Sequence, residues 1–198
     1  PGLSMITRRQ AVMLAPAGVL AAGLVGVAAW TQLRADPDGP VVPIGGPFSL
    51  LDGDGRTVTD RDFRGRLMLV YFGYTHCPDA CPTALQDMAT ALDTLGDKRQ
   101  QVVPIFITVD PERDTPGVMK DYAASFGPGM TALSGSIEAV KQAAQSYRVY
   151  YAKHPTTDGY DMDHSSIIYL MDRQGRFLAN FTHETPPEQI AAKLRSLV

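Results

Sequence analysis

The two cysteines of the chain, Cys77 and Cys81, are the side chains best suited to chemistry, and they lie in residues 73–82, GYTHCPDACP. Side chains at positions i and i+4 of a helical turn share a face, so both sulfurs can point at one spot. The N-terminus of an adjoining helix would also favour a thiolate over a thiol. Because thiolates bind soft metals and exchange disulfides, the pair is a candidate for either chemistry.

The spacing of the cysteines favours a metal site. A C-x-x-C pair is typical of a dithiol oxidoreductase, and the C-x-x-x-C pair here allows a wider separation with a metal ion between the sulfurs. Two thiolates rarely complete a metal site, and His164 is the best candidate for a third ligand. Two thiolates and one imidazole suit Cu(I) in a trigonal site and can also hold Cu(II), whereas zinc would need a fourth ligand.

The elements around these residues must bring them together. Residues 67–72 form a continuous apolar run, which predicts a strand buried on both faces, and residues 82–95 show the apolar spacing of a helix. Sites in open α/β sheets lie at the carboxyl ends of strands, where the cysteine segment begins. His164 immediately precedes a predicted strand over residues 165–171. If that strand lies beside the cysteine-bearing strand, His164 reaches the same end of the sheet.

The remaining pattern predicts an α/β fold. Residues 48–51 and 56–59 flank a Gly-rich turn and predict a β-hairpin, and residues 102–109 predict a second buried strand. Helices are expected to begin at Thr115, Ser136 and Thr185, each a residue that can cap a helix. A late hairpin is predicted from strands 165–171 and 177–182. This order predicts a mixed sheet flanked by helices, in the thioredoxin-like arrangement.

Composition excludes several classes of protein. The chain has 198 residues, of which 44% are apolar and 20% charged, which is typical of a globular domain. Two cysteines are too few for a disulfide scaffold or a four-thiolate zinc site. The formal net charge of −3 gives no broad basic surface, so nucleic acid is not an expected partner.

The N-terminal segment predicts membrane targeting. Residues 11–30 carry no charge, and a helix of that length would span roughly 30 Å, the hydrocarbon thickness of a bilayer. Arg8 and Arg9 precede the segment, which places the N-terminus in the cytoplasm by the positive-inside rule. A retained signal anchor is favoured over a cleaved signal peptide because the run is long and ends at Trp30.

Three parts of the chain follow from this interpretation. Residues 1–35 form a cytoplasmic tip and signal anchor, the Pro- and Gly-rich residues 36–47 form a linker, and residues 48–198 form the thioredoxin-like domain. The expected location is the bacterial inner membrane, crossed once, with the domain in the periplasm.

Three ordered motifs resemble those of the Sco/SenC family of copper-binding assembly proteins. Residues 71–82, YFGYTHCPDACP, resemble the core motif of the family, and residues 108–116, TVDPERDTP, resemble its second motif. Residues 163–165, DHS, followed by residues 169–172, YLMD, resemble the segment that holds the family's metal-binding histidine. The resemblance runs from about Phe48 to the C-terminus.

The resemblance implies a thioredoxin-like fold and a copper site formed by Cys77, Cys81 and His164. Members of the family help to assemble the binuclear copper site in subunit II of cytochrome c oxidase, by delivering copper, by reducing the cysteines of that subunit, or both. The implied partners are therefore subunit II and other periplasmic copper carriers.

Two other functions compete with a copper chaperone. A membrane-tethered thiol–disulfide reductase would use Cys77 and Cys81 as a redox-active pair without a metal. Thioredoxin-like enzymes keep a cis-proline before the strand that faces their cysteines, and Asp163-His164 stands where that proline would be expected. A peroxide-reducing enzyme or redox sensor ranks last, because the sequence offers no clear site that would stabilise the electrophile beyond Thr75 and Arg113. The chain is expected to be mainly a metal-binding assembly factor, and whether it also has thiol–disulfide oxidoreductase activity is left open.

Other polar residues near the motifs are expected to play supporting parts. His76 should lie beside the ligands or in solvent, and Met162 should pack in the core rather than bind a metal. Two histidines are expected on loops without a metal: His154 and His183. Five acidic or basic residues are also expected on loops, where they orient a ligand or pair with one another: Asp79, Asp163, Asp110, Arg113 and Asp114.

Overall fold

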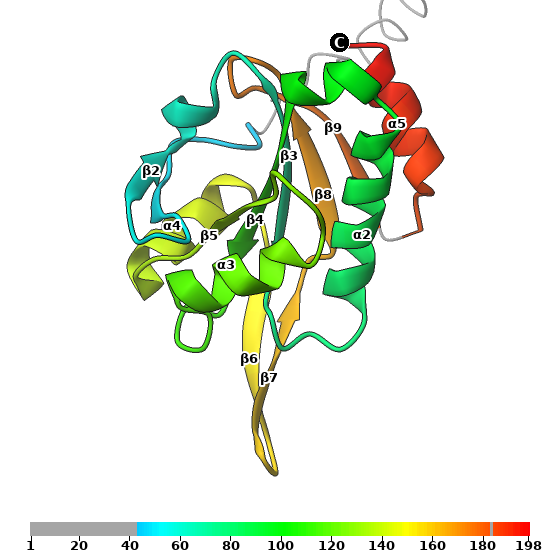
Figure 1. Ribbon diagram of the computed structural model, residues 1–198. Coiled ribbons are helices and arrows are strands. Elements are labelled where there is room, and N and C mark those ends of the chain that lie inside the picture. Colours follow the sequence, from blue (N-terminus) through cyan, green and yellow to red (C-terminus); the bar gives the residue numbers. More distant parts are fainter. Residues whose placement is uncertain (1–42, 183) are drawn as a thin grey trace, which may run out of the picture. The chain divides into compact units, whose positions relative to one another are not determined.

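The computed structural model describes residues 43–182 and 184–198 (Figure 1). Its strands are β1 (Ser49–Leu51), β2 (Thr57–Thr59), β3 (Leu67–Gly73), β4 (Val102–Thr108), β5 (Thr131–Leu133), β6 (Tyr151–Thr156), β7 (Gly159–His164), β8 (Ile167–Met171) and β9 (Phe177–Thr182). Its α-helices are α2 (Ala80–Asp93), α3 (Pro116–Ala124), α4 (Ile137–Ser146) and α5 (Pro187–Arg195). Short 3-10 helices cover Asp60–Phe63 and Gly96–Gln101.

A five-stranded mixed sheet in the order β5-β4-β3-β8-β9 forms the centre of the described domain. Strands β3, β4 and β5 run parallel, and β8 pairs antiparallel with both β3 and β9. Every residue of β3 and β4 is buried, as expected for strands covered on both faces. The sheet therefore confirms the prediction of a mixed α/β core.

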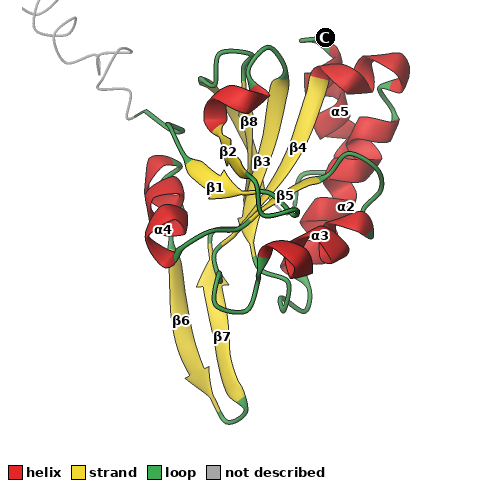
Figure 2. Cartoon of the chain, turned by 60° about the vertical axis from the view of Figure 1, so that its left-hand side comes forward, coloured by secondary structure: helices red, strands yellow, loops and turns green. Residues whose placement is uncertain are grey.

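Helices cover both faces of the sheet (Figure 2). Helices α2, α3 and α5 lie on one face, and α4 lies on the other together with the β1–β2 hairpin. Helix α2 buries the stripe that its apolar spacing predicts, which includes Leu85, Met88 and Leu92. The caps of α3 and α4 were also predicted: Thr115 and Ser136 each accept a backbone N–H of the first turn.

The predicted β-hairpin at the start of the domain is present, with Leu50 of β1 opposite Val58 of β2. Residues before this hairpin already pack on the domain. Ile44 packs against the core, and the N–H of Gly45 donates to the carbonyl of Ser146 at 2.8 Å. The last residues of the predicted linker thus contact the domain directly.

Strands β5, β6 and β7 were not predicted. Strand β5 is three residues long, and strands β6 and β7 form an antiparallel hairpin in which Tyr151 pairs with His164. Figures 1 and 2 show this hairpin projecting beyond the end of the main sheet. His164 was predicted to lie directly before a strand at residues 165–171; instead, it is the last residue of β7, and β8 begins at Ile167.

The predicted membrane anchor at residues 11–30 lies outside the described residues. Within residues 43–182 and 184–198, no helix has the length and apolar character needed to cross a bilayer.

Candidate metal centre

Cys77 and Cys81 lie where β3 leads into α2, at the carboxyl end of the buried strand. Helix α2 begins at Ala80, so Cys81 is in its first turn and Cys77 is in the loop before it. The N-cap residue Asp79 makes no side-chain capping bond. Instead the sulfur of Cys77 accepts the backbone N–H of Cys81 at 3.4 Å, and thereby partners one of the free N–H groups at the start of the helix.

His164 approaches the cysteines from the end of β7, a separate element of the fold. Strand β8, which follows it after two residues, pairs antiparallel with β3, so the end of β7 meets the carboxyl end of the cysteine-bearing strand. The Nε2 atom of His164 lies 3.3 Å from the sulfur of Cys81. Its Nδ1 atom lies 3.2 Å from the carbonyl oxygen of Ser165, which is positioned to accept an N–H there and leave the lone pair of Nε2 facing the sulfurs.

The structure thus brings the three predicted ligands together. The two sulfurs and one ring nitrogen of His164 all lie within 4.8 Å of one another. Bonds of about 2.3 Å in a trigonal plane place the ligand atoms about 4 Å apart, so this cluster is of the size that a single metal ion requires. Two thiolates and an imidazole are soft donors and suit copper.

The two thiols share one proton. Cys81 donates its S–H to Cys77, which is the largest cause that lowers the pKa of Cys77, to about 3; burial opposes this effect, and the backbone N–H groups of Asp79 and Cys81 add to it. The same hydrogen bond to Cys77 raises the pKa of the Cys81 thiol, and burial raises it again. Cys77 is therefore a half-buried thiolate, and Cys81 is a buried thiol held against it.

Two tyrosines hold the imidazole in place. The rings of Tyr71 and Tyr74 both meet the His164 ring edge to face, with centroids 6.0 Å and 5.8 Å away. The hydroxyl of Tyr71 also donates to the sulfur of Cys81 at 3.9 Å. Burial raises the pKa of both phenols, so both stay neutral.

Gly73 leaves room for a sulfur. A Cβ atom added at Gly73 would lie 2.6 Å from the sulfur of Cys81 and 3.0 Å from a ring carbon of Tyr71. The last residue of β3 must therefore lack a side chain if Cys81 is to keep its position. This role of Gly73 was not predicted, because it depends on how closely α2 packs against the strand.

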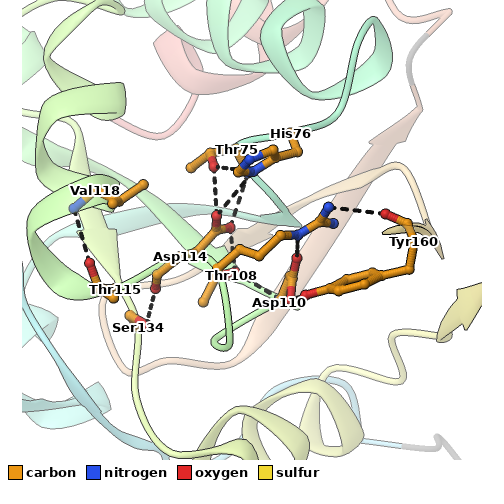
Figure 3. A network of polar contacts seen from close by, with 10 residues as sticks. Thr75, His76, Thr108, Asp110, Asp114, Thr115, Val118, Ser134 and Tyr160 are labelled. Atoms are coloured by element: carbon orange, nitrogen blue, oxygen red, sulfur yellow. Dashed lines mark hydrogen bonds and ion pairs between the residues drawn. The ribbon is translucent and has the colours of Figure 1, made fainter. Parts of the chain in front are cut away.

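A buried carboxylate fixes the loop before Cys77 (Figure 3). Asp114 is fully buried and accepts hydrogen bonds from the Thr75 backbone N–H at 3.0 Å, the Thr75 hydroxyl at 2.6 Å and the Thr108 hydroxyl at 2.7 Å. The expected grouping of acidic and basic residues is present here, because Arg113 pairs with the buried Asp110 in the same loop. The carboxylate of Asp114 itself accepts hydrogen bonds from Thr75 rather than from an arginine.

The other residues singled out from the sequence lie outside the donor cluster. His76 is exposed and contacts Thr75, as expected, and Met162 is buried in the core. Asp163 orients an imidazole, but it is that of His154, at 2.8 Å, and both side chains are exposed. Asp79 is exposed at the start of α2, and His183 lies outside the described residues.

Comparison with protein families matches residues 37–198 to the family described as SCO1/SenC. The chain is 42% identical over 158 residues to the protein sco1 of Schizosaccharomyces pombe, in an alignment that covers 77% of this chain and 60% of that protein. The chain therefore spans less than two thirds of the length of this relative.

Solved structures of Sco proteins are also similar to this chain. The structure of Bradyrhizobium japonicum ScoI with copper bound is 49% identical in sequence, with a TM-score of 0.74 over 78% of this chain and 99% of that one. A structure that identifies a disulfide switch in BsSco, a member of the Sco family of cytochrome c oxidase assembly proteins, is 25% identical. Its TM-score is 0.63 over 80% of this chain and 95% of that one.

Proposed function

The chain belongs to the SCO1/SenC family, and we propose from this premise that it binds copper and passes it on during assembly of cytochrome c oxidase. The observation that carries the proposal is the cluster of Cys77, Cys81 and His164, whose donor atoms all lie within 4.8 Å. A relative of the same fold, 49% identical, has been solved with copper bound. The three donors are the ligands that we assign to the copper.

The burial of the ligands suggests how copper would leave. Cys81 is fully buried, whereas Cys77 and His164 are partly exposed. An acceptor thiolate can therefore approach the copper from the side of Cys77 and His164 and replace them one at a time, so that the ion is never free in water. We propose that the acceptor is subunit II of the oxidase, whose binuclear copper site requires such a delivery, and that other periplasmic copper carriers supply the ion.

A thiol–disulfide reductase is the second candidate, and the thiolate of Cys77 favours it. This thiolate would attack one sulfur of a target disulfide, form a mixed disulfide and release the other target sulfur as a thiolate. Cys81, after losing its proton, would then attack the sulfur of Cys77 and release the second target thiolate. The product is an oxidised Cys77–Cys81 pair, which cannot bind copper, so one function would switch off the other.

The proposed location follows from the sequence of residues 1–35. We propose that this segment anchors the chain in the bacterial inner membrane and holds the domain in the periplasm. Alkaline phosphatase fused to the C-terminus should be active in cells, and the chain should remain in membranes after carbonate extraction. An inactive fusion or a fully soluble chain would contradict the anchor.

The decisive experiment compares copper binding in the reduced wild-type chain and in the His164→Ala, Cys77→Ala and Cys81→Ala variants. Wild type should bind about one copper per chain and show a thiolate-to-Cu(II) charge-transfer band, and each variant should lose the band. His154→Ala is the matched control, because His154 is an exposed histidine on the same hairpin that pairs with Asp163. Unchanged copper loading in His164→Ala would remove His164 from the site.

The same variants separate the two candidates. A reductase should keep reducing a model disulfide after His164→Ala, because its chemistry needs the two sulfurs alone. A copper chaperone should lose copper transfer with that one substitution. Retained disulfide reduction together with an absence of copper binding in wild type would favour the reductase.

A further inference from the structure

Strand β7 is fixed to the domain along one of its faces. Successive side chains of a strand point to opposite faces, so Tyr160, Met162 and His164 share a face. Tyr160 is partly buried, Met162 is buried and His164 is partly buried, whereas Asp161 and Asp163 between them are exposed. The imidazole at the end of β7 is therefore placed by whatever holds Tyr160 and Met162.

Arg113 holds Tyr160 through two direct contacts and through a carboxylate that both residues share. Its guanidinium carbon lies 3.9 Å from the centroid of the Tyr160 ring, and its Nη1 donates to the Tyr160 carbonyl oxygen at 3.0 Å. Its Nε pairs with the carboxylate of Asp110, and the Tyr160 hydroxyl donates to the same carboxylate at 2.8 Å (Figure 3). Because the side chain of Asp110 is only 2% exposed, these bonds are shielded from water.

Arg113 also contacts the wall of the metal centre. The guanidinium carbon lies 5.7 Å from the centroid of the Tyr74 ring, and that ring meets the imidazole of His164 edge to face. The next residue, Asp114, fixes Thr75 two positions before Cys77. One short loop thus contacts both the segment that carries the cysteines and the hairpin that carries the histidine.

The hairpin needs such a tether. A two-stranded ribbon is marginally stable by itself, and β6 and β7 pair with no other strand of the described chain. Met162 anchors the middle of β7, but methionine is flexible and specifies position poorly. The planar guanidinium, in contrast, bonds a backbone carbonyl and a carboxylate at the same time and so restricts the orientation of the strand.

We propose that Arg113 is a positioning residue for His164: through Tyr160 and Tyr74 it holds β7 so that the imidazole stays against the two sulfurs. The proposal rests on the proposed copper function, because it makes Arg113 a determinant of how long the copper keeps its histidine ligand. Arg113 does not touch the copper itself. It acts before any acceptor arrives, by setting the position from which His164 must move.

The test uses Arg113→Lys and Tyr160→Phe in the full chain. Lysine keeps the positive charge but lacks the planar fork with which the guanidinium bonds Asp110 and the Tyr160 carbonyl, and phenylalanine keeps the ring but loses the bond to Asp110. Each variant should transfer Cu(I) to a Cu(I) chelator about tenfold faster than wild type, the lower part of the range for residues that orient a metal ligand. The nitrogen hyperfine signal of bound Cu(II) should weaken in parallel.

A control makes the result specific. Arg176→Lys is the matched substitution, because Arg176 pairs with Asp172 at 2.7 Å at the opposite end of β8 from His164, and it should leave transfer unchanged. A wild-type transfer rate in both Arg113→Lys and Tyr160→Phe, or an equal increase in Arg176→Lys, would overturn the proposal.

A measurement without metal separates this proposal from the copper function. In the copper-free chain, hydrogen exchange of the β7 amides should be faster in Arg113→Lys than in wild type and unchanged in Arg176→Lys. Faster exchange supports the tether even if wild type fails to hold copper, which would overturn the proposed function alone. Unchanged exchange in Arg113→Lys overturns the tether whatever the copper result.

Discussion

The sulfur of Cys77 accepts the backbone N–H of Cys81 at 3.4 Å, so the first cysteine caps the helix that carries the second. A thiolate accepts this bond better than a thiol does, because the N-terminus of a helix carries partial positive charge. The helix and the proton of Cys81 thus both favour ionised Cys77. One of the two sulfurs is therefore already in the thiolate form that a soft cation binds.

The first prediction concerns alkylation of the reduced chain by iodoacetamide. The pKa of Cys77 is lowered to about 3, so the thiolate persists as pH falls and is lost only as pH approaches that value. Alkylation of Cys77 should change by less than about twofold between pH 5 and 7.5, where an ordinary cysteine loses about tenfold per unit. Mass spectrometry of the labelled peptide measures the rate. A tenfold fall per unit at Cys77 would contradict the shared proton.

The second prediction concerns protons released by Cu(I). One proton is shared between Cys77 and Cys81, and its place is on Cys81, whose pKa is raised by the bond to Cys77. Binding at pH 7.5 should therefore release about one proton per copper, where two ordinary thiols would release nearly two. Titration in a weakly buffered indicator solution gives the count. A value near two would show that Cys77 is protonated in the free chain.

The third prediction concerns Gly73→Ala. The added methyl group would lie 2.6 Å from the sulfur of Cys81, so the helix or the sulfur must shift. We expect a loss of about 1–3 kcal/mol in the free energy of unfolding by urea, together with weaker copper binding. Gly117→Ala is the control, because a Cβ at Gly117 in α3 meets nothing within 4 Å. Equal stability of the two variants would mean that the site tolerates a wider separation of α2 from β3.

The fourth prediction concerns Asp114→Asn. Asparagine keeps one acceptor oxygen and replaces the other by an NH2 group, which cannot accept the bonds that Thr75 or Thr108 donates to that carboxylate oxygen, so part of the network is lost. Urea unfolding should show a loss of about 1–3 kcal/mol. Asp97→Asn, at an exposed residue of the 3-10 helix Gly96–Gln101, should change stability by less than about 0.5 kcal/mol. Wild-type stability in Asp114→Asn would show that Thr75 is held by other contacts.

The donor cluster could be predicted because each of its parts has a local signal. The apolar run at β3 marks a strand buried on both faces, and the cysteines follow it directly. His164 was predicted to reach them from a strand beside β3, and β8 does pair with β3. That inference holds although His164 belongs to β7, because β7 ends only two residues before β8 begins.

The hairpin and its tether could not be predicted from the sequence. Strand β6 reads YAKHPT, and a proline, a lysine and an exposed histidine give it no alternating apolar pattern. The hydrogen bond from Arg113 to the carbonyl of Tyr160 joins residues that are 47 positions apart in the sequence, and no local motif predicts it. The role of Gly73 depends on the distance between a strand and a helix, which spacing in a sequence does not contain.

The alternation along β7 has a consequence for how this chain can vary. Insertion of a single residue between Tyr160 and Asp163 would exchange the two faces of the strand beyond it, and Asp163 would then take the place of the imidazole. A carboxylate is a hard oxygen donor, so the site would favour a different class of cation. Length changes at the hairpin tip leave this parity intact. The tip can therefore diverge among related chains while the stretch from Tyr160 to His164 keeps a fixed number of residues.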